Sequence, residues 1–313
     1  MSAPSNGTVI ETDALTKRYG SVVAVENLSL TVPKGGVFGL LGPNGSGKTT
    51  TMGMLLGLVK PSGGVFRLLG HEGASPNILR RIGAIVETPA FYPYLSGRDN
   101  LRFFQGLSGK GSTKEIDDLL GRVDLLARAN SKFSTYSFGM KQRLGIAYAL
   151  LGDPELVFLD EPTNGLDPAG VAGVREFIAD LGSSGRTVIM SSHILHEVEM
   201  VCERVAILVK GRLIAQGRVQ ELIEHREAVW LKTTDDAAAA KVLAALPWVG
   251  EVATEDGGLV AKTPLARALE ISKTLADAHI YIHKLTPVTV SLEEYFLEVT
   301  GNGTSVARSE ARQ

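Results

Sequence analysis

The sequence has little of what marks secreted and membrane-spanning proteins. Cys202 is its only cysteine, so no disulfide can form within the chain, and its apolar neighbours predict a buried structural thiol. No segment approaches the roughly 18 uninterrupted apolar residues that a membrane span needs. The first residues have neither the basic nor the apolar region of a signal peptide. We therefore expect the chain to stay in the cytosol.

An excess of one charge is also missing. The chain has 32 Lys and Arg residues against 34 Asp and Glu residues, a net charge of -2. Such a balance gives no overall field that would attract nucleic acid, and we predict no nucleic-acid partner. The 313 residues are 44% hydrophobic, which is enough for a substantial core and, for this length, about two domains.

A glycine-rich stretch, LLGPNGSGKTTTMGMLLG at residues 40–57, is the most informative segment present. It matches G-x-x-x-x-G-K-S/T in full and lies between a short apolar strand and a run of helix formers, the context that a phosphate-binding loop requires. Loop amides would hold the phosphates, the lysine would neutralise the β- and γ-oxygens, and the next hydroxyl would ligate Mg²⁺. The predicted nucleotide-binding residues here are Gly42, Pro43, Asn44, Gly45, Ser46, Gly47, Lys48, Thr49 and Thr50.

Two adjacent carboxylates supply the second half of such a site. The apolar run LVFLDEP, residues 156–162, ends in Asp160 and Glu161. Neighbouring side chains at the end of a strand point to opposite sides, so Asp160 can face Mg²⁺ while Glu161 faces the γ-phosphate and acts as base for the attacking water. We predict Asp160 and Thr49 as metal ligands and Glu161 and Lys48 as catalytic residues.

The segment YSFGMKQRLGIAYALL, residues 136–151, resembles the signature of the ATP-binding subunits of ABC transporters, normally Leu-Ser-Gly-Gly-Gln. Two positions whose hydroxyl and N–H can touch a phosphate are kept, while Tyr136 and two others depart from the consensus. In this family the signature completes the ATP site of a second subunit. The resemblance therefore implies ATP contacts in trans from Ser137, Phe138, Gly139 and Met140.

Further elements follow in the order of that family. Residues 164–167, NGLD, resemble its D-loop, and SSH at 191–193 follows an apolar strand as the switch histidine does. The resemblance implies that Asp167 and His193 act in catalysis. Tyr19 in LTKRYG is similar to the family's adenine-stacking aromatic residue.

Glu87 stands where the family usually has the glutamine of its Q-loop. A carboxylate there still reaches Mg²⁺ or the lytic water, but it adds negative charge beside phosphates. In this respect the chain resembles exporters that protect bacteria from bacitracin and lantibiotics. The aromatic residues Phe91, Tyr92 and Tyr94 follow, either as a docking patch for a partner's coupling helix or as packing within a helical insert.

The fold implied is α/β, a P-loop NTPase of the ABC ATPase type with an antiparallel β subdomain and a helical subdomain. Beyond the ATPase domain, the residue pattern predicts a β-α-β-β-α-β succession, that of a ferredoxin-like unit. The predicted segments are a disordered N-terminus at 1–8, the ATPase domain at 9–222 with a helical subdomain at about 88–153, a small C-terminal α/β domain at 226–300 and a disordered tail at 301–313.

The resemblance implies ATP and Mg²⁺ as cofactors, separate transmembrane permease subunits as partners, and a head-to-tail self-dimer around two ATP molecules. It places the protein at the inner face of the cell membrane, as the ATPase of an exporter of antibiotics, peptides or drugs. Export of a lipid or polysaccharide, or a non-transport ABC ATPase, stays open. A GTPase is disfavoured because the chain has no N-K-x-D motif for reading guanine.

Overall fold

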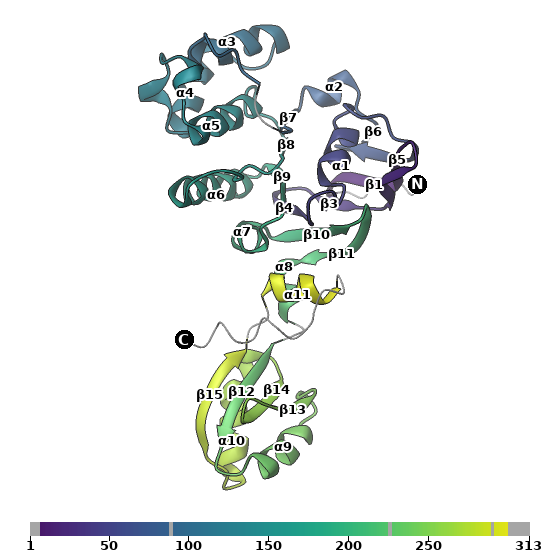
Figure 1. The fold of residues 1–313 in the computed structure, drawn as a ribbon, viewed down its shortest axis with the longest axis vertical. Coiled ribbons are helices and arrows are strands. Elements are labelled where there is room, and N and C mark those ends of the chain that lie inside the picture. Colours follow the sequence, from purple (N-terminus) through teal and green to yellow (C-terminus); the bar gives the residue numbers. More distant parts are fainter. Residues whose placement is uncertain (1–6, 88–89, 225–226, 289–290, 300–313) are drawn as a thin grey trace. The chain divides into compact units, whose positions relative to one another are not determined.

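The computed structural model describes residues 7–87, 90–224, 227–288 and 291–299, arranged in two units (Figure 1). The first unit ends at Gly217 and the second begins at Arg218. The predicted tail at 301–313 and most of the predicted disordered N-terminus lie outside the described residues. Thr8 already belongs to the first strand.

A six-stranded sheet forms the centre of the first unit, with the strand order β11-β10-β4-β9-β8-β7. Neighbours from β10 to β7 run parallel. The strands β8 and β9 are buried along their whole length, as expected for a parallel sheet covered by helices on both faces. The bounds are β4 Gly36–Leu41, β7 Ile82–Ile85, β8 Leu156–Leu159, β9 Thr187–Ser192, β10 Arg204–Val209 and β11 Arg212–Arg218.

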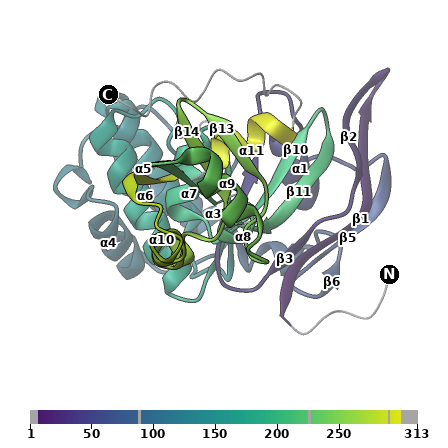
Figure 2. The same cartoon turned by 90° about the horizontal axis from the view of Figure 1, so that it is seen from below.

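A second sheet of the same unit is antiparallel, with the order β2-β1-β5-β6 and with β3 paired to β1. Figure 2 shows β1, β2 and β5 on one side of the unit and α4, α5 and α6 on the other. The bounds are β1 Thr8–Tyr19, β2 Val22–Leu28, β3 Thr31–Pro33, β5 Gly63–Leu68 and β6 His71–Glu72.

Seven α-helices and two 3-10 turns complete the described part of the first unit, and α3, α4 and α5 make up the helical insert. A capping box forms at Ser112 and Glu115, with both reciprocal hydrogen bonds present. The sequence pattern missed β7, because four apolar residues between helices carry no strand period. The bounds are α1 Lys48–Leu55, α2 Pro76–Leu79, α3 Gly97–Ser108, α4 Thr113–Arg122, η1 Leu126–Arg128, η2 Phe133–Thr135, α5 Phe138–Ala149, α6 Pro168–Ser183 and α7 Leu195–Val201.

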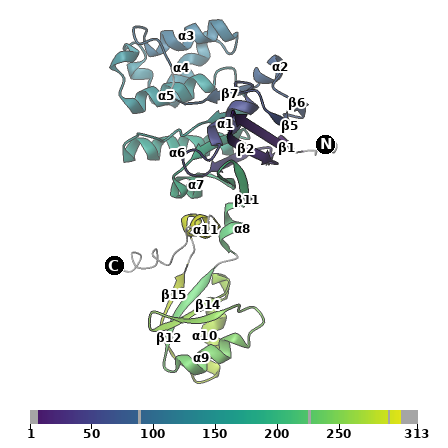
Figure 3. The same cartoon turned by 45° about the vertical axis from the view of Figure 1, so that its right-hand side comes forward.

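The second unit contains a four-stranded antiparallel sheet with the order β13-β14-β12-β15. Helices α9 and α10 lie along this sheet (Figure 3) and share one apolar core with it. The succession of elements is the predicted ferredoxin-like one. The bounds are α8 Val219–Glu224, β12 Ala228–Thr233, α9 Asp236–Ala244, β13 Val252–Glu255, β14 Gly258–Lys262, η3 Leu265–Arg267, α10 Ala268–Asp277, β15 Ile282–Val288 and α11 Leu292–Val299.

Among the described residues, the structure contains no helix that is both long and apolar enough to cross a bilayer.

Asp236 fixes the start of α9 to the end of β12. Its carboxylate accepts hydrogen bonds from Lys232 Nζ at 2.6 Å and from the amide and the hydroxyl of Thr233, each at 2.8 Å. The hydrogen bond from Lys232 is the largest cause that lowers the pKa of Asp236 from 3.8 to about 2.

We expect Asp236→Ala to lower the free energy of unfolding of the second unit by about 1 kcal/mol at neutral pH. Because the folded pKa is depressed, this stabilisation is complete above 3.8 and is lost as the pH falls to about 2. Urea unfolding at several pH values, followed by tryptophan fluorescence, measures this free energy, since Trp230 and Trp248 both lie in the second unit. The control is Asp277→Ala, at an exposed position. If the free energy of unfolding of Asp236→Ala depended on pH in the same way as that of wild type, the stabilising role of Asp236 would be wrong.

Candidate nucleotide site

The glycine-rich loop joins β4 to α1 at the carboxyl edge of the parallel sheet, and two of its glycines have no room for a side chain. A Cβ at Gly42 would lie 2.1 Å from the carbonyl oxygen of Leu208, and one at Gly47 would lie 2.6 Å from that of Ala24. Gly47, with φ 102°, is also left-handed immediately before α1. The loop therefore approaches neighbouring backbone closely and leads its amides into a helix N-terminus, an arrangement that suits an anion.

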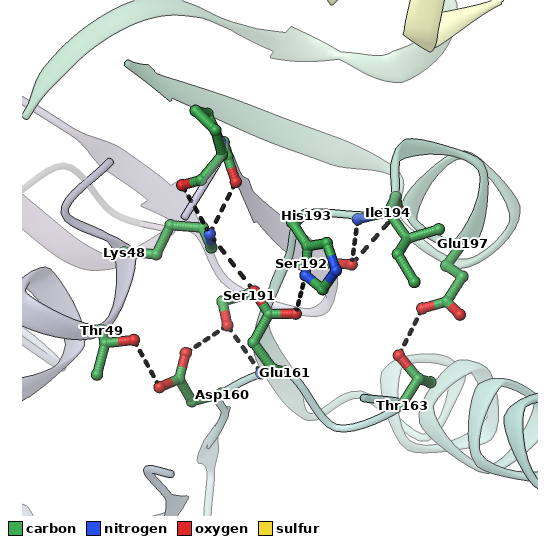
Figure 4. Close-up of polar contacts among 12 residues, drawn as sticks. Lys48, Thr49, Asp160, Glu161, Thr163, Ser191, Ser192, His193, Ile194 and Glu197 are labelled. Atoms are coloured by element: carbon green, nitrogen blue, oxygen red, sulfur yellow. Dashed lines mark hydrogen bonds and ion pairs between the residues drawn. The ribbon is translucent and has the colours of Figure 1, made fainter. Parts of the chain in front are cut away.

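Lys48 lies across this loop and is only 6% exposed. Its Nζ donates to the carbonyl oxygens of Gly42 at 2.7 Å and Pro43 at 3.3 Å. Its third partner is Glu161, whose Oε1 is 3.4 Å away (Figure 4). A buried ammonium needs such partners, and phosphate oxygens would offer it stronger ones.

Asp160 is buried and accepts a hydroxyl hydrogen bond on each oxygen. Thr49 Oγ1 donates to Oδ2 at 2.8 Å, and Ser191 Oγ donates to Oδ1 at 2.5 Å. A hydroxyl and a carboxylate side by side are hard oxygen ligands of the kind that Mg²⁺ takes. The described residues contain no group of three His, Cys, Asp or Glu that could hold a metal alone. This donor set fits a Mg²⁺ ion carried mainly by nucleotide phosphates and water.

Glu161 points to the opposite side from Asp160, as the sequence predicts. Its Oε2 lies 2.8 Å from Nδ1 of His193, while its Oε1 faces Lys48 (Figure 4). Glu161 itself is left-handed, with φ 47°, which is unusual for a residue with a side chain. Lys48, Thr49, Asp160, Glu161 and His193 thus come together from the ends of two strands, β8 and β9, and the start of α1.

Sequence reasoning missed Ser191 as part of this cluster. Besides its bond to Asp160, its Oγ accepts the amide of Glu161 at 2.8 Å. The available signal was a serine that follows the apolar residues VIM of a buried strand, because a buried hydroxyl needs a partner.

A second pair of buried side chains joins the loop after Glu161 to the helix after His193. Thr163 Oγ1 donates to Oε2 of Glu197 at 2.5 Å, and both residues are buried. Thr163 immediately precedes the predicted D-loop, and Glu197 lies on α7 (Figure 4).

The other predicted site residues lie on separate elements. Tyr19 ends β1, is 49% exposed and has Lys17 Nζ 4.7 Å from its ring centroid. Glu87 is exposed and left-handed just beyond β7. Asp167 caps α6, accepting the amide of Gly170 at 2.9 Å.

The predicted signature residues begin α5. Ser137 is its N-cap and accepts the amide of Met140 at 3.3 Å. Phe138, a departure from the consensus, packs its ring against Gly165 of the D-loop segment, where a Cβ would meet the ring at 2.9 Å. The signature and D-loop segments therefore touch within one chain.

Comparisons with known proteins agree with this geometry. A family model described as ABC transporter matches residues 25–164. The bacitracin transport ATP-binding protein BcrA of Enterococcus faecalis is 37% identical over 299 residues, which cover 94% of this chain and 96% of that protein.

This chain belongs to the ABC transporter ATP-binding proteins. A fluoroquinolones export ATP-binding protein of Mycobacterium tuberculosis is 41% identical over 307 residues, covering 96% of each protein. The solved structure of an ATP-binding subunit of an ABC transporter, 31% identical with a TM-score of 0.62, covers 69% of this chain and 92% of that one. The predicted family and fold class are confirmed, and this ABC protein binds and hydrolyses ATP.

Glu161→Gln is expected to leave ATP binding in place and to lower the turnover number by about 10² to 10⁴, since it removes a base while keeping the shape of the side chain. Steady-state ATP hydrolysis and equilibrium nucleotide binding measure the two effects separately. Glu155→Gln, at the opposite end of β8, is the matched control and should turn over like wild type. Hydrolysis by the Glu161 variant at the wild-type rate would show that Glu161 is not the base.

Lys48→Ala is expected to weaken ATP binding itself by at least about tenfold, because a charge-assisted contact to phosphate is lost. Fluorescence titration with a labelled ATP analogue measures the dissociation constant. The exposed Lys34→Ala is the control for loss of one positive charge. Equal affinity in the Lys48 variant and wild type would remove Lys48 from the phosphate site.

Proposed function

We propose that this ABC protein is the Mg²⁺-dependent ATPase of an exporter that moves an antibiotic, peptide or drug through separate membrane subunits. The observation that supports it most is the contact of Glu161 with both Lys48 and His193 beside the glycine-rich loop. Its relatives named for bacitracin transport and fluoroquinolone export support the exporter class. The transported molecule would be selected by the membrane subunits.

Each residue of the cluster has a chemical role in this proposal. The loop from Gly42 to Thr50 and Lys48 bind the phosphates, and Tyr19 stacks on adenine. Thr49, Asp160 and Glu87 would hold Mg²⁺. Glu161 takes a proton from the attacking water, and His193 orients Glu161 and bonds the γ-phosphate. Bound Mg²⁺ would supply neutralisation of charge on the phosphates.

The active form is a head-to-tail dimer in this proposal. Phe138, next to the capping Ser137 at the start of α5, is 48% exposed, so the helix N-terminus has an open side for a phosphate of a second copy. Two copies related by a twofold axis would then share two ATP molecules, each between a glycine-rich loop and the residues Ser137, Phe138, Gly139 and Met140. Asp167 would lie close to this junction, because Gly165, two residues before it, lies against the ring of Phe138.

The aromatic cluster of the helical insert divides into a packed and an exposed part. The ring of Phe91 makes edge contacts with Phe104, Phe133 and Tyr148 inside the insert. Tyr94 and Phe103, by contrast, are 65% and 45% exposed, and both flank Tyr92. Exposed aromatic side chains in one patch are typical of protein interfaces.

We assign the exposed part to the membrane subunits. Tyr92, Tyr94 and Phe103 would contact a cytoplasmic helix of the permease, and the protein would then lie at the inner face of the cell membrane. There it meets the cytoplasmic ATP pool. Phe91 then contributes to packing within the insert. Of the two roles considered for these aromatic residues, packing applies to Phe91 and docking applies to the exposed residues.

The double variant Tyr94→Ala and Phe103→Ala is expected to lose co-purification with co-expressed membrane subunits, because aromatic anchors carry much of an interface's binding energy. ATP binding by the isolated subunit should stay at the wild-type level. Leu269→Ala, on the most exposed large apolar side chain of α10, is the control. Undiminished recovery of the permease with the double variant would exclude this patch as the contact.

A further inference from the structure

The hydroxyl of Ser191 bridges the two carboxylate residues of the site. It donates to Oδ1 of Asp160 at 2.5 Å and accepts the backbone N–H of Glu161 at 2.8 Å (Figure 4). Ser191 is 0% exposed, so water does not compete for either bond. The Ser191 side chain therefore contacts both Asp160 and Glu161, whose side chains point to opposite sides.

The parallel sheet explains how the bridge arises. The last paired residues of β8 and β9 are Leu159 and Met190. One residue further on, the amide of Asp160 bonds the carbonyl of Ile85 on the β7 side, at 2.9 Å. Successive amides along a strand point in opposite directions, so the amide of Glu161 points toward β9.

At that level the backbone of β9 is already paired on its other side, where Ser191 stands opposite Leu40 of β4. The side-chain oxygen of Ser191 thus takes the place of a carbonyl in the ladder. It satisfies a buried N–H that the end of β8 would otherwise leave without an acceptor.

The bridge bears on function through the backbone of Glu161. This residue is left-handed, and a strained conformation persists only where its surroundings hold it. The turn sends the Glu161 side chain to Lys48 and His193, while Asp160 stays directed at Thr49. The amide that Ser191 accepts belongs to this strained residue.

A buried serine can also be a purely structural group, and β9 offers an example. At its opposite end the buried hydroxyl of Thr187 accepts the amide of Gly35 at 2.8 Å. Ser191 differs because it also donates to a carboxylate. With Thr49 on the other oxygen, both Asp160 oxygens are held and the plane of the carboxylate is fixed.

We propose that Ser191 is a positioning residue of the ATPase site, whose hydroxyl sets the plane of the Asp160 carboxylate and the turn at Glu161. It acts through these residues and does not touch the nucleotide. This inference rests on the proposed role of Asp160 as a ligand in the Mg²⁺ shell. Partners that orient a metal ligand are typically worth 10- to 100-fold in metal affinity or activity.

Ser191→Ala is tested by titrating Mn²⁺ into the full chain with a non-hydrolysable ATP analogue and recording the electron paramagnetic resonance of free Mn²⁺. We expect Mn²⁺ affinity to fall by about tenfold or more and the turnover number by about 10- to 100-fold. Binding of the analogue in the presence of EDTA should change by less than about twofold. Ser191→Thr keeps the hydroxyl and should recover most of the Mn²⁺ affinity.

Thr187→Ala is the matched control, because it removes a buried hydroxyl from the same strand that also accepts an amide. Its thermal stability should fall by an amount similar to that of Ser191→Ala, with Mn²⁺ affinity as in wild type. Equal loss of Mn²⁺ affinity in both variants would show a general loosening of the sheet and overturn the proposal. Failure of Ser191→Thr to recover affinity would overturn it as well.

Asp160→Asn separates this inference from the function on which it rests. If Asp160→Asn weakens Mn²⁺ binding and Ser191→Ala does not, the positioning role of Ser191 is wrong and the metal site stands. If neither variant changes Mn²⁺ affinity, Asp160 is not in the metal shell and both assignments fall.

Discussion

Three parallel strands of the central sheet end at one edge, and the site depends on that alignment. The register pairs β4 with β9 from Gly36 and Thr187 onward, and β9 with β8 as far as Met190 and Leu159. The glycine-rich loop, the two carboxylates and His193 follow directly from these ends. Because backbone hydrogen bonds fix the register, residues more than 100 positions apart meet within hydrogen-bond distance, as Thr49 and Asp160 do.

Burial of charge is the second constraint on this edge. Lys48 and Asp160 are 6% and 5% exposed, and a charge so far out of water is costly unless it is paired. Lys48 has two carbonyls and one carboxylate, whereas Asp160 has two hydroxyls. The two buried charges therefore belong to neighbouring but different networks, and Glu161, which is more exposed, connects the first network to His193.

The sequence predicted what lies in contiguous motifs. The motif of the glycine-rich loop identified Lys48 and Thr49 as site residues. The apolar run before Asp160 predicted that this carboxylate lies at the end of a buried strand. The βαββαβ pattern of the second unit was visible because strand and helix periods alternate there. In contrast, β7 has four residues and no usable period. The bridge by Ser191 depends on the register between β8 and β9. The difference between the packed Phe91 and the exposed Tyr94 depends on tertiary packing. Neither can be predicted from local sequence.

The buried hydrogen bond between Thr163 and Glu197 connects two segments that are 34 residues apart in the sequence. The bond joins the loop that runs toward Asp167 to α7, the helix that begins two residues after His193. A displacement of α7 is therefore passed to the loop before Asp167. By reciprocity, a displacement of that loop is passed to α7 with the same coupling energy.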